Sequence, residues 1–79
     1  MAQQFVGTDP VKPTGTPGGV GVVQLVSFSG SVDLQASVDG TNWTSIDTFT
    51  VPAVKAVTLA PQMRIVQTGG SDAVVKLEG

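Results

Sequence analysis

The sequence has no cysteine, no histidine and no tyrosine among its 79 residues. Without cysteine there can be no disulfide, and without cysteine and histidine the usual zinc sites cannot form. A chain this short buries only about 60% of its unfolded surface, so its stability is marginal. Disulfides, metals and oligomerisation are the usual supports of such small domains. We therefore expect a single domain that gains buried surface by oligomerising or by docking onto a larger body.

Charge is also scarce, at 13% of residues against 41% hydrophobic ones, with a net charge of −2. The four cations are scattered along the chain, whereas a phosphate-binding surface needs them clustered. We therefore predict no nucleic-acid partner. The low charge favours a surface partly hidden in an interface, and a Ser/Thr-rich surface solvated without charges is the equally weighted alternative.

Targeting signals are not visible either. The N-terminal residues have neither the basic start nor the apolar run of a signal peptide. The longest apolar stretch, at residues 20–28, is too short to span a bilayer. We therefore predict synthesis in the cytoplasm and no membrane partner.

Because the chain has no His, Cys or Tyr, it lacks the side chains that most often serve as general bases and nucleophiles. Paired carboxylates could replace them, but no two of the acids share an apolar setting that would raise one pKa. The sequence therefore predicts a protein that is not an enzyme and needs no cofactor. The acids are Asp9, Asp33, Asp39, Asp47, Asp72 and Glu78.

The first 19 residues differ in composition from the rest, with three prolines and four glycines. Proline removes a backbone donor and fixes φ, so this segment cannot form a helix or an inner strand. We predict an extended N-terminal arm over residues 1–19 and a β-sandwich domain over residues 20–79. A flexible leader and an arm that docks on a neighbouring subunit are weighted equally. The candidate partner-binding residues of the arm are Phe5, Val6, Pro10, Val11 and Pro13.

From Val20 onward the chain reads as short strands divided by turn residues. Ser31–Val38 alternates apolar and polar residues, which is typical of a strand with one buried face. We predict an all-β fold, a small antiparallel β-sandwich or barrel of about six strands, jelly-roll-like, with strands paired as hairpin neighbours. The other predicted strands are Val20–Phe28, Trp43–Val51, Val54–Leu59, Met63–Thr68 and Ala73–Glu78. The predicted core is Val22, Leu25, Val32, Leu34, Val38, Trp43, Ile46, Phe49, Val57, Leu59, Ile65, Val74 and Leu77.

The segment SVDGTNWT, residues 37–44, is a secondary candidate site formed by Asp39, Asn42 and Trp43. Asp39 and Asn42 could supply oxygen ligands to calcium, but a dedicated loop would place several acids in close succession. An Asp that bonds its own backbone is the preferred interpretation, and we predict no metal site. Trp43 could stack on a sugar or fill the core. The core is preferred because this small domain has few other aromatic residues.

Two segments carry a family resemblance. VDLQASVDGTNWTSI resembles the strand–turn–strand of discoidin-like domains, and APQMRIVQTGGSDAVVKLEG resembles their closing hairpin, but only these hairpins match. The Asp-box of sialidases is also similar, although residues 37–40 are one residue too short for it. Over most of its length the chain looks most like small β-sandwich proteins of tailed bacteriophages, which combine S-x-D-G-T-N-W with an R-[IV] strand and a V-x-L-x-G ending.

The bacteriophage resemblance implies a capsid decoration (cement) protein or a virion accessory protein. Such a protein would be located on the capsid surface of the virion and bind the major capsid protein. It would form a homo-oligomer, with a trimer favoured, and clamp neighbouring shell subunits. The alternative is a carbohydrate-binding module, or a receptor-binding or tail accessory domain, that uses Trp43.

Overall fold

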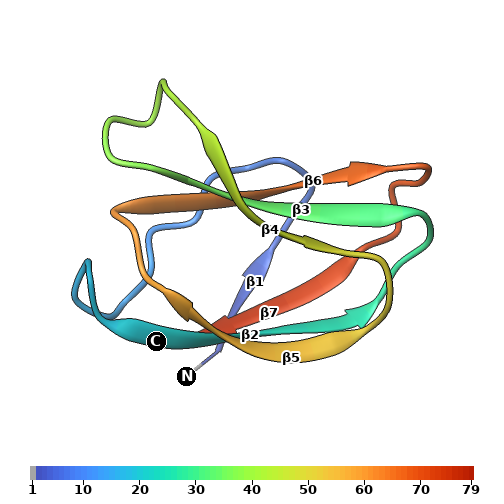
Figure 1. The fold of residues 1–79 in the computed structure, drawn as a ribbon, viewed down its shortest axis with the longest axis horizontal. Coiled ribbons are helices and arrows are strands. Elements are labelled where there is room, and N and C mark those ends of the chain that lie inside the picture. Colours follow the sequence, from blue (N-terminus) through green and yellow to red (C-terminus); the bar gives the residue numbers. More distant parts are fainter. Residues whose placement is uncertain (1) are drawn as a thin grey trace.

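The computed structural model describes residues 2–79, which form a sandwich of two antiparallel β-sheets (Figure 1). Sheet A has the strand order β1-β7-β2-β5 and sheet B the order β4-β3-β6. These residues contain no helix, so the all-β prediction is confirmed. The strands are β1 (Gln3–Phe5), β2 (Val20–Ser27), β3 (Ser31–Ser37), β4 (Thr44–Phe49), β5 (Ala53–Thr58), β6 (Gln62–Thr68) and β7 (Val74–Glu78).

All six predicted strands are present, with ends that agree within two residues. Their pairing differs from the prediction of hairpin neighbours. Only β3 and β4 are consecutive strands that pair, whereas β2 pairs with β5 on one side and β7 on the other. The reason is that the chain crosses between the two sheets at most of its turns, so successive strands face each other across the core.

The core lies between the two sheets and consists of their inward side chains. Eight of the predicted core residues are buried there: Leu25, Val32, Leu34, Phe49, Val57, Leu59, Ile65 and Leu77. Four further buried side chains were not predicted: Phe5, Val23, Met63 and Val75. Phe5 belongs to β1, a strand inside the segment predicted to be an extended arm.

Two core predictions are wrong because of strand parity. Successive residues of a strand point to opposite faces, so a strand cannot bury residues an odd number of positions apart on one face. In β2 the inward residues are Val23 and Leu25, and Val22 is exposed on the outer face. In β7 the inward residues are Val75 and Leu77, and Val74 is only half-buried.

Three more core predictions are wrong for local reasons. Val38 follows the end of β3 and is 83% exposed. Ile46 lies at a β-bulge, where the register passes from Leu34–Asp47 to Gln35–Ser45, and is 44% exposed. Trp43 is half-buried and lies outside the core cluster.

The proline-rich segment before β2 runs along the sandwich of its own chain (Figure 1). β1 pairs with β7 at the edge of sheet A. Val11 then pairs with Met63 of β6 at the edge of sheet B, through backbone hydrogen bonds of 2.7 and 2.9 Å. The segment therefore joins one edge of each sheet. β1 is an edge strand, the only kind of strand that such a proline-rich segment can supply.

Candidate functional site

The five candidate residues of the arm are not gathered into one surface. Phe5 is 1% exposed and packs in the core of its own chain, opposite Val75. Val11 is half-buried and bonded to β6, and Pro13 is also half-buried. Only Val6, 63% exposed, and Pro10 are open to solvent. In this arrangement Phe5 contributes to the chain's own stability and offers no contact surface to a partner.

Polar contacts fasten the arm as a unit. The Gln3 side chain donates through Nε2 to the carbonyl of Lys12 at 2.9 Å and accepts at Oε1 from the amide of Thr14 at 3.2 Å. These bonds tie the first strand of the arm to its return segment. The Thr14 hydroxyl also donates to the carbonyl of Gly79. The arm therefore closes the side of the sandwich that carries β1 and β6, which we call the arm side.

The turn after β3 is organised around the Asp39 carboxylate. Four donors bind it: the Ser37 hydroxyl, the amides of Thr41 and Asn42, and the Asn42 side chain, at 2.8–3.0 Å. These hydrogen bonds, led by the Asn42 amide, hold the pKa of Asp39 well below its usual value. The Gly40 amide donates to the Ser37 hydroxyl at 2.8 Å, and Gly40 has a φ of 76°, which favours glycine.

These hydrogen bonds confirm the preferred interpretation, an Asp that bonds its own backbone. The side chains of Asp39 and Asn42, the two expected oxygen donors, bind each other. Within residues 2–79, no three acidic side chains gather as a metal site would require. The turn is thus an Asp-centred bend that satisfies its own backbone, as the sequence predicts.

Trp43 lies on the outer face of sheet B, where the Arg64 guanidinium sits 4.3 Å from its ring centroid. Arg64 is fixed by donating from Nε to Gln35 Oε1 at 2.7 Å, and the two residues are cross-strand partners in β3 and β6. This is a cation–π contact. The preferred core interpretation of Trp43 is therefore wrong. One face of the ring is also occupied by Arg64, so only the remainder is available to a ligand.

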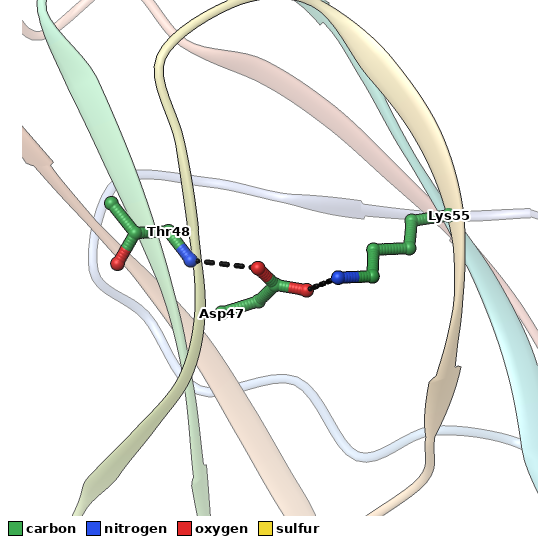
Figure 2. A network of polar contacts seen from close by, with 3 residues as sticks. All are labelled: Asp47, Thr48 and Lys55. Atoms are coloured by element: carbon green, nitrogen blue, oxygen red, sulfur yellow. Dashed lines mark hydrogen bonds and ion pairs between the residues drawn. The ribbon is translucent and has the colours of Figure 1, made fainter.

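The opposite side of the sandwich, with the edges of β4 and β5, is covered by no other strand of the described chain, and we call it the open side. A groove of about 440 Å³ lies there, lined by Ile46, Ala56 and Leu59 among others. Lys55 of β5 bridges to Asp47 of β4 across it, with Nζ 2.5 Å from Oδ2 (Figure 2). Figure 2 also shows the Thr48 amide donating to the other carboxylate oxygen at 3.0 Å. The bond from Lys55 lowers the pKa of Asp47.

The outer face of sheet A carries exposed aliphatic side chains on β2 and β5, and the sequence analysis did not predict this surface. The register sets Val22 beside Ala56 and Gln24 beside Val54. Val26 shares a surface hollow with Val54 and Pro52. The alternation of β2 would have predicted this surface, because with Leu25 facing the core, Val20, Val22 and Val26 must face outward. We call it the apolar face, and it consists of Val20, Val22, Val26, Val54 and Ala56.

No helix among residues 2–79 has the length and apolar character needed to cross a bilayer. No protein-family model, curated protein sequence or solved structure matches the chain.

Proposed function

We propose that the chain is a non-enzymatic virion structural protein, a capsid decoration or cement protein that binds the major capsid protein on the outside of an assembled phage shell. The apolar face of sheet A is the observation that carries the proposal. The resemblance of the two hairpins to bacteriophage sandwich proteins indicates the kind of partner. The apolar face supplies the surface that such a partner would cover.

The composition of this surface suits a protein interface. Val20 and Val54 are 73% and 64% exposed, and clusters of exposed aliphatic side chains are common in protein interaction sites, which supports the proposal. On the adjacent strand β7, Lys76 and Glu78 lie beside Gln24 and Val22. An apolar centre with charged groups at its margin is the usual composition of a protein–protein interface.

The size of the protein also permits this role. A standard interface buries about 800 Å² on each partner, and the described chain exposes 4349 Å². One docking face would therefore use about a fifth of the surface. A protein bound only to assembled subunits stabilises the assembly by mass action, since its binding free energy must be lost before the subunits separate. A trimer would present three such faces at a local symmetry axis of the shell.

Binding to undecorated shells tests the proposal. The double variant Val22→Ser with Val54→Ser changes the apolar face, and Val38→Ser is the matched control because Val38 is exposed on a turn away from it. Co-sedimentation should show at least tenfold weaker binding of the double variant, since two apolar contacts are lost, and unchanged binding of the control. Equal binding of all three proteins would exclude the apolar face. A wild-type protein that binds no shell would overturn the function itself.

A carbohydrate-binding role is the second candidate, because Trp43 lies on the surface and not in the core. Its fluorescence, the only tryptophan signal of the chain, can be followed during titration with sugars. The decoration proposal predicts an emission that sugars leave unchanged, both in the wild type and in Arg64→Ala, which uncovers the ring. A saturable shift would favour the carbohydrate-binding module instead.

A further inference from the structure

The arm reaches its own sandwich through contacts that a second copy of the chain would offer in the same form. Phe5 enters the core beside β7, Val11 pairs with Met63, and Thr14 bonds to Gly79. The bonds from the Gln3 side chain to Lys12 and Thr14 lie inside the arm and would move with it. Residues 2–14 can therefore be transferred as one unit.

A single turn directs the arm back onto its own chain. At residues 16–19 the sequence Thr-Pro-Gly-Gly forms a turn in which the Gly19 amide donates to the Thr16 carbonyl at 2.9 Å. Pro17 occupies the second position, and Gly18 occupies the third with a φ of 88°. This is the arrangement of a type II turn, which needs a positive φ at its third residue. If the turn straightens, the arm points away from the molecule.

We propose that the arm is exchanged between copies of this chain, each arm filling the site beside β7 and β6 of a neighbouring copy. The turn at residues 16–19 is the hinge. Such reciprocal exchange keeps the contacts of residues 2–14. It breaks the hinge's own bonds to the sandwich, from the Gly18 amide to the Leu59 carbonyl and from the Leu59 amide to the Gly19 carbonyl, both 2.8 Å. The balance between the closed monomer and the exchanged oligomer therefore depends on the hinge and on concentration. The inference goes beyond the proposed function and stands without it, and it gives the chain a route to the homo-oligomer that its small core favours.

Burial and reach limit how the exchange can occur. Phe5 is almost completely buried, so an empty arm site would expose a large apolar slot. An arm therefore leaves its own site only where another arm replaces it. A straightened hinge of four residues spans about 13 Å, which is shorter than the 30 Å length of the molecule. The two copies must therefore lie in direct contact.

Two glycines allow a matched test of the hinge. Gly18 and Gly7 both have positive φ, and a Cβ atom added to either would meet no atom within 4 Å. Gly18→Val therefore strains the turn without a steric clash, and the strain disappears when the hinge extends. Gly7→Val introduces comparable strain inside the transferred unit, where it is the same in both states. We expect Gly18→Val to shift the equilibrium toward oligomer by about tenfold per arm and Gly7→Val to leave it unchanged.

Sedimentation or light scattering over a concentration series measures the shift after unfolding and refolding. A Gly18→Val protein that stays monomeric wherever Gly7→Val does would overturn the proposal. Equal oligomerisation of both variants would also overturn it, because the hinge would then have no special role.

A cross-link distinguishes exchange from ordinary association. Gln4 of β1 faces Lys76 of β7, and the natural chain has no cysteine. Chains carrying Gln4→Cys are refolded with tagged chains carrying Lys76→Cys, both in the Gly18→Val background, and then oxidised. Exchange predicts a disulfide between the two kinds of chain in the oligomer fraction, and little in the Gly7→Val background. Oligomers without this link would show association through another surface and refute the exchange.

Discussion

The arm side and the open side of the sandwich are closed by different means. On the arm side, a continuous segment pairs with β7 and then with β6, and it places Phe5 in the core. On the open side, the edges of β4 and β5 are joined by one ion pair above a groove. The chain thus seals one side with its own residues and leaves the other available to a partner. In the proposed decoration role, the groove and the nearby apolar face of the open side would meet the shell protein.

The open side is nevertheless protected against uncontrolled strand addition. An exposed edge strand offers unpaired backbone groups to any other extended chain, and proteins commonly place lysine, proline or inward charges there. β5 follows Pro52 and carries Lys55, which is directed to Asp47 across the gap. A partner on this side is therefore expected to use the side chains of the apolar face more than the backbone of β5.

The largest expected effect comes from removing the anchor of the arm side. Phe5→Ala should lower the free energy of unfolding by about 3–5 kcal/mol, because it leaves a cavity in the core. Chemical denaturation followed by circular dichroism measures the loss. Val6→Ala is the control and should change the stability little, because Val6 is exposed. Similar losses for both variants would mean that β1 does not seal the core.

A smaller effect is expected at the groove of the open side. Ile46→Ala should cost about 1 kcal/mol, since this side chain is only partly withdrawn from water. Phe49→Ala, in the same strand but buried, should cost about 3–5 kcal/mol. The same denaturation assay compares them. A loss at Ile46 as large as at Phe49 would show that the groove is closed in solution and that the two sides do not differ.

The smallest expected effect concerns the ion pair. Lys55 is 55% exposed, so the pair should contribute less than about 1 kcal/mol. A double-mutant cycle with Lys55→Met and Asp47→Asn isolates the coupling. Because folding lowers the pKa of Asp47, its contribution is present above about pH 4, the unfolded value, and is lost as the pH falls through the folded value.

The stability of the wild type should therefore decrease more than that of Asp47→Asn between pH 5 and 2. Asp39 and Asp72, whose pKa values are also lowered, remain in both proteins, so the difference isolates Asp47. Parallel pH profiles would show that the ion pair does not hold the open side.

The strands were predictable because apolar and polar residues alternate along most of them, or because Gly, Pro and Asn residues follow their ends. Their faces were harder to assign in β2 and β7. The run VGVVQLV places valines on both faces of the strand. The core prediction included both Val22 and Leu25, although these residues are three positions apart and therefore point to opposite faces. The pairing of strands was not predictable either. Whether β2 joins β5 or β3 depends on the packing of the complete sandwich, and short loops are compatible with both.

The candidate site was predicted in part. The Asp39 turn follows from local sequence, since its hydrogen bonds lie within residues 37–42. The surface position of Trp43 was not predictable because its partner Arg64 is 21 positions away and meets it only through the pairing of β3 with both β4 and β6. The burial of Phe5 in its own chain was not predictable, because Phe5 lies in the Pro/Gly-rich segment before Val20, which predicts an extended arm. No local pattern shows that the chain folds back to bury it.

The hydrogen bonds of the Asp39 turn have a consequence for chemical ageing. Asp-Gly sequences isomerise when the glycine amide nitrogen attacks the aspartate side chain and forms a cyclic imide. Here the carboxylate is held by four donors and the Gly40 amide is engaged by Ser37, so the attacking and attacked groups are both restrained. We therefore expect Asp39 to persist unmodified for as long as the protein stays folded, and to isomerise at the usual rate of an Asp-Gly sequence only after unfolding.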